Sequence, residues 1–303
     1  MQKALGVILA EFSVFESDFF PFYPLSDLTT LRIGGPCRML AVPKSEAVLL
    51  RLLSLLDEAG IPRVILGNGS NILAPDEGYR GVVIRTTALR DVYLADGGIH
   101  AACGTPLSAV IRVANKAGIG GLASLAGIPA TVGGAVFMNA GAFGACIGDA
   151  VSFVRAAPQV GGTALQLLGS ECLFSYRRSI FQSHTLPILS ACFTGPEEAP
   201  DELCALSATA LRTRRERHPT DLPNAGSIFR RPREGEAWRL IERAGLRGAC
   251  VGGAMVSQKH AGFIVNAGGA TAKDVRTLIA RIQTEVYERT GILLAREIEY
   301  LGE

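Results

Sequence analysis

Two glycine-rich segments contain the residues of this chain that are best suited to ligand chemistry. Residues 127–144 read GIPATVGGAVFMNAGAFG and include no ionisable side chain, and the turn GNGSN at residues 67–71 follows an apolar run. Glycine allows positive φ and removes the Cβ that would hold a ligand away from the main chain. Main-chain N–H groups can then bind phosphate oxygens. Either segment alone could be a tight turn, but together they predict one long, phosphate-bearing ligand.

Neither segment matches the common nucleotide-binding fingerprints. The pattern GxxxxGK[ST] is absent, and so is a GxGxxG between a strand and a helix. A bound dinucleotide would therefore lie outside a Rossmann unit.

Three further sites each allow a structural and a functional interpretation, and a fourth, Ser227, is a candidate because of its neighbours. Arg32, in TTLRIGGP, is either a surface charge or a phosphate or flavin contact. The basic run LRTRRERH at residues 211–218 is either a solvated helix face or a rim for an acidic substrate. Glu297 follows an apolar run, where an unpaired carboxylate is costly, so it forms a salt bridge or is an active-site acid. Ser227 lies close to two arginines and outside any GxSxG motif.

Composition narrows the class of protein. The chain has 303 residues, 48% of them hydrophobic, so it can bury a sizeable core. Its net charge of +2 gives no reason to expect nucleic acid or an acidic membrane as a partner. No apolar stretch reaches the roughly 20 residues of a membrane-spanning helix. The seven cysteines include no CxxC pair, which indicates buried thiols in a reducing cytoplasm.

Helix and strand patterns divide the chain into α+β parts. The first residues predict an amphipathic helix, and Ser45-Glu46 opens a second helix that Gly60 ends. A third begins with Thr105 as N-cap and Pro106 in the first turn, and runs to Gly118. Further helices are predicted over 201–217, 238–244 and 271–289. Strands are predicted over 82–87, 91–95, 98–104, 151–157, 163–168, 250–256, 262–265 and 292–301.

Seven motifs in order resemble one family over nearly the whole chain, the bacterial UDP-N-acetylenolpyruvoylglucosamine reductases. They are TTLRIGGP, LGNGSNIL, GIPATVGGAVFMNAGAFG, SYRRSIF, NAGSIFRRP, VGGAMVSQKHAGFIVN and REIEYLG. The short interval between SYRRSIF and NAGSIF resembles the compact subgroup that lacks an extra substrate-covering insertion. A glutamate that often precedes the last catalytic residue of the family is replaced here by Ala295 and Arg296.

This resemblance implies an α+β fold with a two-part FAD-binding domain of the vanillyl-alcohol oxidase type and a C-terminal substrate domain. We expect the first FAD-binding part at residues 1–84 with the tail 298–303, the second at 85–200, and the substrate domain at 201–297. It also implies a cytoplasmic enzyme of peptidoglycan precursor synthesis, and hence of cell wall formation, cell shape and cell division. We expect a monomer without a bound metal.

The resemblance also assigns roles to residues. Arg177, Ser227 and Glu297 match the catalytic positions, and Tyr176, Arg230 and Arg214 are candidates for binding the substrate phosphates or carboxylate. The residues assigned to FAD are Arg32, Gly67, Asn68, Gly69, Ser70, Asn71, Gly127, Thr131, Gly133, Gly134, Asn139 and Gly141.

The implied reaction reduces UDP-N-acetylglucosamine enolpyruvate with NADPH through FAD to UDP-N-acetylmuramate. Arg177 and Glu297 would stabilise the charge that develops on the substrate carboxylate, and Ser227 would deliver a proton to the adjacent carbon. Two alternatives are an FAD-dependent oxidase of the same fold that acts on an alcohol or sugar, and a flavin-binding protein without turnover. The first does not account for Ser227 together with Arg177, and the second makes all three catalytic matches coincidental.

Overall fold

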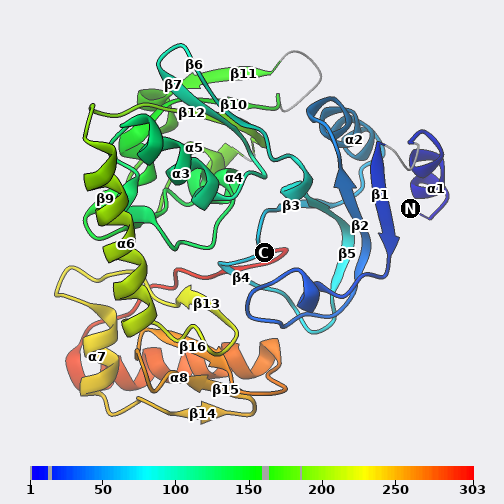
Figure 1. Ribbon diagram of the computed structural model, residues 1–303. Helices are drawn as coiled ribbons and strands as arrows, with labels where there is room; N and C mark the ends of the chain where they lie inside the picture. The colour runs from blue at the N-terminus through cyan, green and yellow to red at the C-terminus, as the bar shows by residue number, and fades with distance from the viewer. Residues whose placement is uncertain (1, 13–15, 159–163, 185) are drawn as a thin grey trace. The chain divides into compact units, whose positions relative to one another are not determined.

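A computed structural model describes residues 2–12, 16–158, 164–184 and 186–303. The chain forms two compact units (Figure 1). Unit 1 contains residues 1–21, 39–68 and 81–213, and unit 2 contains residues 22–38, 69–80 and 214–303. The three domains expected from the sequence stay a prediction, but the compact units group segments 22–38 and 69–80 with the C-terminal residues.

The first sheet of unit 1 has the strand order β1-β2-β5-β3. β1 (Ser17–Pro21) and β2 (Cys37–Pro43) pair antiparallel, and β3 (Arg63–Leu66) and β5 (Tyr79–Arg85) pair in parallel. Helix α2 (Glu46–Glu58) begins at Ser45, whose side chain accepts a hydrogen bond from the N–H of Val48. Its apolar residues are buried as their spacing predicts, and burying each leucine contributes roughly 1.5–3 kcal/mol. The amphipathic first helix is α1 (Gln2–Ala10).

The second sheet of unit 1 is antiparallel, in the order β11-β10-β12-β7-β6. Helices α3 (Leu107–Ala117) and α4 (Val132–Phe137) pack against it, and α5 (Ile180–His184) contacts α4 (Figure 1). The side chains between these elements form one core. The strands are β6 (Val92–Ala95), β7 (Gly98–Ala102), β10 (Val151–Ala156), β11 (Leu165–Leu168) and β12 (Ile188–Phe193). The predicted start of β11 at Thr163 lies outside the described residues.

Unit 2 is built on a four-stranded antiparallel sheet with one helix against it and a second helix packed on the first. Its order is β13 (Asn224–Ser227), β16 (Phe263–Asn266), β15 (Ala254–Val256) and β14 (Cys250–Val251). Helix α8 (Ala272–Thr290) packs on β14 and β15, and α7 (Ala237–Arg243) packs on α8 (Figure 1). A second buried cluster fills this unit. Helix α6 (Pro200–Arg217) runs from unit 1 into unit 2.

Helix α8 begins where the sequence predicts, and a distant carboxylate completes its cap. Thr271 is the N-cap and forms a capping box with Asp274. The Asp76 carboxylate also accepts hydrogen bonds from the N–H groups of Ala272 and Lys273, at 2.7 and 3.0 Å. These bonds attach segment 69–80 to the C-terminal part of unit 2, because they satisfy N–H groups that a helix cannot pair internally.

Three predicted elements differ from the structure. The last strand is only β17 (Glu299–Tyr300), which pairs in parallel with β4 (Ile72–Leu73), because the residues before it run past β13 with only an isolated bridge. The predicted strand 250–256 is the hairpin of β14 and β15. The N-cap of α3 is Pro106 and not Thr105, whose hydroxyl bonds instead to the Asp91 carbonyl.

The prediction that the cysteines are buried is correct only in part: Cys204 and Cys250 are exposed and Cys146 is half-buried, whereas the other four are buried. Each of the seven cysteines, all of which the structure describes, is a free thiol. Burial raises the pKa of the Cys103 thiol to about 12, so this group is a small hydrophobe at neutral pH. Across the described ranges, no helix combines the length and the apolar character that a membrane span requires.

Candidate functional site

Gly67 and Asn68, the first two residues of the GNGSN loop, lie beside Pro129 and Thr131 of the other glycine-rich segment in unit 1, whereas residues 69–71 belong to unit 2. The Asn68 side-chain amide donates a hydrogen bond of 2.8 Å to the Pro129 carbonyl. A Cβ on Gly67 would lie 2.2 Å from the Thr131 hydroxyl oxygen, so only glycine fits at this contact. The structure therefore brings together the segments that the sequence proposed as parts of one ligand site.

Their main-chain N–H groups differ in availability. Among the described residues, no partner accepts from the N–H groups of residues 68–71. In contrast, the N–H groups of Val132 and Gly133 donate to the carbonyls of Thr105 and Cys103, each at 2.8 Å, and that of Gly134 points to the Thr131 hydroxyl at 3.4 Å. Gly133 and Gly134 thus give a ligand space but few free donors, whereas loop 67–71 has the unpaired N–H groups that fit a diphosphate.

The turn that contains Arg32 lies beside the same loop in unit 2. The Thr30 N–H donates to the Gly69 carbonyl at 3.1 Å, and a Cβ on Gly69 would lie 2.1 Å from the Leu28 carbonyl oxygen. Arg32 adopts a φ of 56° and its side chain is exposed. An exposed guanidinium in this turn is accessible to a ligand, so both interpretations from the sequence remain open.

Arg177 lies at the tip of a tight turn in unit 1. Ser175 and Arg178 exchange main-chain hydrogen bonds of 3.1 and 3.0 Å around it, and its φ is 56°. The Arg177 guanidinium donates to the Gly141 carbonyl at 2.9 Å and lies over the exposed Tyr176 ring, 5.0 Å from the centroid. These contacts hold a planar cation at the turn, and a guanidinium group is of the type that binds a carboxylate or phosphate.

Two residues that the sequence assigned to the cofactor support this turn. Asn139 is buried, donates to the Ser175 carbonyl at 2.8 Å and accepts from the Gly148 N–H at 3.0 Å. At Gly141 a Cβ would come within 3.1 Å of the Arg177 guanidinium. Both residues contact the turn that carries Arg177, so their observed role in the fold is structural.

Ser227 and Glu297 are brought together in unit 2. The Glu297 N–H donates to the carbonyl of Ile228, the residue after Ser227, at 2.7 Å. Ser227 ends β13 with an exposed side chain, and within the described ranges no group of the chain hydrogen-bonds its hydroxyl. Glu297 is half-buried. An accessible hydroxyl and a carboxyl group on neighbouring segments are suited to moving a proton and holding an anionic group.

Arg230 and Arg214 also belong to unit 2, whereas Tyr176 and Arg177 belong to unit 1. The Arg230 N–H bonds to the Ala295 carbonyl at 2.8 Å, on the same segment as Glu297. Its guanidinium Nε is buried and has no hydrogen-bond partner in the described part of the chain. A buried donor without an acceptor is costly, so this guanidinium fits an anionic ligand.

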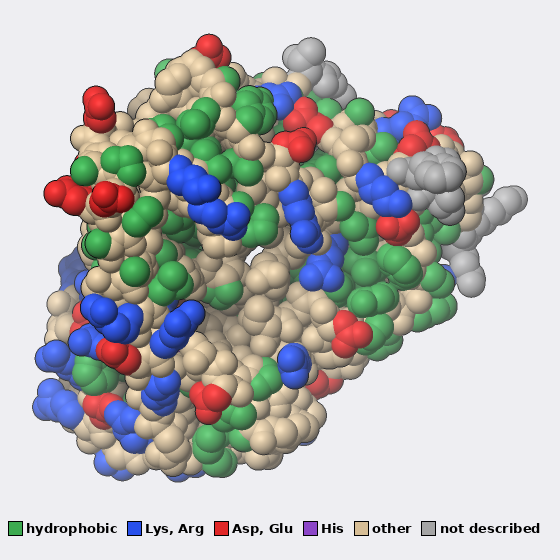
Figure 2. Space-filling model, in the orientation of Figure 1, with side chains coloured by type: hydrophobic (Ala, Val, Ile, Leu, Met, Phe, Trp, Pro, Cys, Tyr) green, Lys and Arg blue, Asp and Glu red, His purple; other side chains and the backbone are tan. Residues whose placement is uncertain are grey.

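Basic side chains gather over α7 and the C-terminal end of α6 (Figure 2). Next to them lies an aromatic cluster that the sequence did not single out as a site. His218 and His260 pack edge to face with ring centroids 5.6 Å apart, and both contact Phe263. Burial, followed by Arg214, lowers the pKa of His218 to about 4, and burial also lowers the pKa of His260. Both rings are therefore neutral at pH 7.

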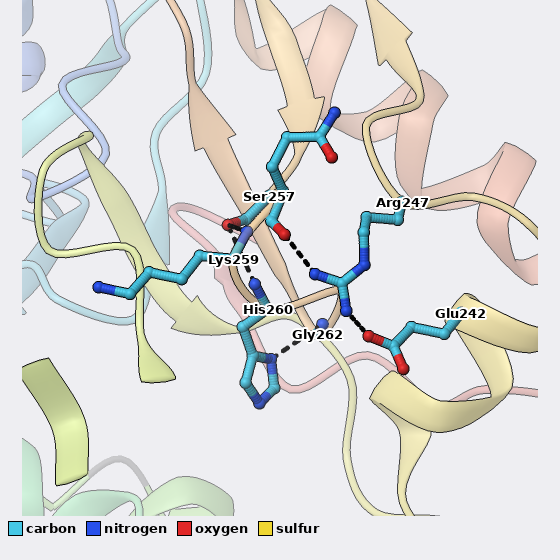
Figure 3. A network of polar contacts seen from close by, with 7 residues as sticks. Glu242, Arg247, Ser257, Lys259, His260 and Gly262 are labelled. Carbon is cyan, nitrogen blue, oxygen red and sulfur yellow. Dashed lines mark hydrogen bonds and ion pairs between the residues drawn. The ribbon is translucent and has the colours of Figure 1, made fainter. Parts of the chain in front are cut away.

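Hydrogen bonds fix the loop that carries His260 (Figure 3). The Ser257 hydroxyl accepts from the N–H groups of Lys259 and His260, and the Nδ1 atom of His260 accepts from the Gly262 N–H at 3.1 Å. Arg247, paired with Glu242, donates to the Gln258 carbonyl. The motif VSQKHAG was the available sequence signal, but a histidine in a motif does not reveal which residues pack around it.

Comparisons with known proteins cover both units. Residues 218–301 match the model of the UDP-N-acetylenolpyruvoylglucosamine reductase C-terminal domain, and residues 37–164 match that of an FAD binding domain. The chain is 41% identical over 289 residues to the UDP-N-acetylenolpyruvoylglucosamine reductase of Caldicellulosiruptor bescii, covering 94% of this chain and 91% of the relative. It is 45% identical over 280 residues to that of Moorella thermoacetica, covering 92% of each.

A solved structure gives the same result. The crystal structure of UDP-N-acetylenolpyruvylglucosamine reductase from Thermus caldophilus aligns with a TM-score of 0.78 at 34% identity, covering 94% of this chain and 98% of that one. The predicted α+β class, with an FAD-binding domain and a separate C-terminal domain, is thereby confirmed. The chain belongs to the family of UDP-N-acetylenolpyruvoylglucosamine reductases and is an FAD-containing oxidoreductase.

Proposed function

We propose that this enzyme uses NADPH to reduce UDP-N-acetylglucosamine enolpyruvate to UDP-N-acetylmuramate, a cytoplasmic step of peptidoglycan precursor synthesis. Relatives that match over most of their length are named as reductases of this enolpyruvyl sugar nucleotide. Within the chain, the main observation is the 2.7 Å bond from Glu297 to Ile228, which keeps a carboxyl group close to the exposed Ser227.

The cofactor fits the loop chemistry of this chain. In this proposal the unpaired N–H groups of residues 68–71 hold the FAD diphosphate, and Gly67 and Thr131 shape the surface beside it. When bound, FAD supplies the hydride transfer between NADPH and the methylene carbon of the enol ether.

The catalytic side chains act on the substrate carboxylate and on the carbon atom next to it. Hydride addition at the methylene carbon breaks the carbon–carbon π bond and moves negative charge onto the substrate carboxylate. The Arg177 guanidinium stabilises this charge and Glu297 hydrogen-bonds the same group. Ser227 then gives its proton to the adjacent carbon, which completes the reduction with NADP⁺ as the other product.

The charged substrate needs further contacts. We assign Arg230 to an anionic group of the substrate, because its buried Nε lacks a protein acceptor. Tyr176 and Arg214 remain candidates for the same task.

A site in which Ser227 is the acid must exclude water. An alcohol protonates carbon only when the intermediate is strongly basic and no competing acid is nearby.

Anaerobic absorbance measurements test the proposal. NADPH should bleach the yellow protein, and the enolpyruvyl sugar nucleotide should then restore the colour with formation of UDP-N-acetylmuramate. Recolouring by oxygen alone would indicate the oxidase alternative. A protein that stays yellow with NADPH and does not turn over would be a flavin-binding protein.

A further inference from the structure

The last residue of the cofactor loop is hydrogen-bonded to the backbone that carries Glu297. The Asn71 side-chain amide donates to the Glu297 carbonyl at 3.2 Å, and the Asn71 carbonyl accepts from the Glu299 N–H at 3.0 Å. The two segments then continue as the parallel pair β4 and β17, in which Glu299 is opposite Ile72. All of these residues lie in unit 2.

Both main-chain polar groups of Glu297 are therefore fixed. Its N–H bonds to the Ile228 carbonyl at 2.7 Å, and its carbonyl accepts from Asn71. Fixing the N–H and the carbonyl of one residue sets the direction in which its Cα–Cβ bond points, and so determines where the carboxyl group can reach. Since only one of these two bonds depends on a side chain, Asn71 is the position through which the sequence controls Glu297.

The same loop is also linked to the turn that carries Ser227. The Thr30 N–H donates to the Gly69 carbonyl at 3.1 Å, and the Thr30 hydroxyl donates to the Asn224 carbonyl at 2.7 Å. The Asn224 side chain in turn accepts from the Gly226 N–H at 3.1 Å. Loop 67–71 is thus attached on one side to the segment of Glu297 and on the other to the turn before Ser227.

The Asn71 side-chain amide contacts protein, while the N–H groups of residues 68–71 stay unpaired. A ligand that binds these N–H groups fixes the loop, and a fixed loop holds Asn71 against Glu297. Thermodynamic linkage is reciprocal: if ligand binding to the loop favours the Asn71–Glu297 hydrogen bond, then this hydrogen bond favours ligand binding by the same free energy.

We propose that Asn71 is a positioning residue for Glu297 and couples occupancy of the cofactor loop to the placement of this acid. This inference rests on the proposed function for the role of Glu297 in the reaction. It replaces the expectation that the Asn71 side chain contacts FAD.

A double-mutant cycle with stopped-flow absorbance tests the inference. Asn71→Ala should slow recolouring by the enolpyruvyl substrate by up to about 100-fold, the cost of roughly 1 Å of misplacement in an active site. With the protein saturated with FAD, bleaching by NADPH should be slowed much less than recolouring, because Glu297 has no role in that step. In a Glu297→Gln background the same Asn71→Ala change should slow recolouring by less than about threefold, because the group that it positions is already lost.

Hydrogen exchange gives a readout that does not depend on turnover. In Asn71→Ala, the amides of residues 297–301 should exchange faster, and α8 should be unchanged. Added FAD should slow exchange of 297–301 in the wild type and much less in the variant. Asn266→Ala is a control for the loss of a side-chain amide elsewhere in unit 2. Asn266 donates a 3.2 Å bond to the Leu31 carbonyl and also accepts from the N–H groups of Gly268 and Ala270, so the control removes more hydrogen bonds than Asn71→Ala does. It should leave exchange at 297–301 unchanged.

Three outcomes would overturn the inference. The first is that Asn71→Ala slows recolouring equally in the wild-type and Glu297→Gln backgrounds, and the second is unchanged hydrogen exchange at residues 297–301. The third is a loss of FAD affinity with neither slower recolouring nor faster exchange, which would mean that the Asn71 amide binds FAD directly. Normal turnover of Glu297→Gln alone is a different result. It would remove Glu297 from the proposed function, and the exchange experiment would still decide whether Asn71 holds its backbone.

Discussion

The Glu297 N–H donates a 2.7 Å hydrogen bond to the carbonyl of Ile228, so the backbone of Glu297 is bonded to the residue that follows Ser227. The backbone itself makes this contact, which means that changes to either side chain leave it in place. Substitutions of either side chain therefore leave this backbone hydrogen bond available.

Ser227→Ala should separate the two half-reactions. The hydroxyl is exposed and, in the part of the chain that is described, makes no hydrogen bond, so its removal should change the free energy of unfolding by less than about 0.5 kcal/mol. Loss of a positioned general acid typically costs about 10²- to 10⁴-fold, or roughly 3 to 5 kcal/mol of barrier.

The variant should stay yellow and bleach normally with NADPH, and stopped-flow absorbance should show slow recolouring by the substrate. Equal slowing of both steps would reduce Ser227 to a supporting role. Recolouring at the wild-type rate would assign the proton to another group or to water.

Arg177→Lys should not be a conservative change. The Arg177 side chain donates to the Gly141 carbonyl and lies over the Tyr176 ring. A planar guanidinium can bind a carboxylate through two parallel hydrogen bonds, whereas an ammonium group is a point charge. Turnover should fall by about 10²-fold or more, the range for removing one transition-state donor. FAD binding, measured by flavin fluorescence, should change little. A lysine variant with near-native turnover would exclude Arg177 from the mechanism.

Gly67→Ala should destabilise unit 1 because its Cβ would lie 2.2 Å from the Thr131 hydroxyl oxygen. Overpacking of this kind typically costs about 1–3 kcal/mol. Gly134→Ala is a matched control in the adjoining segment, since its Cβ would lie 3.6 Å from the same oxygen, an ordinary contact in a helix. Thermal unfolding followed by circular dichroism should show a lower midpoint for Gly67→Ala only. Equal midpoints would mean that Thr131 moves away at little cost.

His218 should make stability depend on pH between about 6.5 and 4. Burial and the nearby Arg214 lower its pKa to about 4 in the folded state, from an ordinary value of 6.5. Above pH 6.5 the ring is neutral in both states and contributes nothing. Below pH 6.5 the unfolded chain binds the proton first, so the free energy of unfolding falls until about pH 4.

Urea unfolding of wild type and His218→Gln at several pH values checks this expectation. The wild type should lose more stability than the variant as the pH falls from 6.5 to 4, and the two should run parallel above 7. Because the pKa of His260 is also lowered, His218→Gln should remove only part of the dependence. Parallel curves over the whole range would show that His218 titrates normally in the folded protein.

Much of the local structure follows from the sequence. The spacing of Val48, Leu49, Leu52, Leu53 and Leu56, with Ser45 before them and Gly60 after them, predicts α2 almost to the residue. Thr271 and Asp274 predict the start of α8 in the same way. Caps and 3.6-residue periods are contacts between near neighbours in the chain, so a single sequence contains the information that sets them.

The strand predicted over 292–301 shows where such reasoning stops. Its residues are mostly apolar, but only Glu299 and Tyr300 pair as a strand, because the available partner is the two-residue β4. Strand pairing depends on which edge lies nearby in the fold, and apolar composition does not specify that partner.

The sequence by itself determined the family, the glycine loops and the identities of the candidate catalytic residues, because these are properties of residue type and order. The tertiary structure decided their partners. Asn71 and Glu297 are 226 residues apart in the chain, and Asn139, whose assignment to the cofactor stays a prediction, bonds to the turn of Arg177. The physical reason is that an amide or a carbonyl bonds to whichever group the packed core brings within about 3 Å, and that distance exists only after the chain has folded.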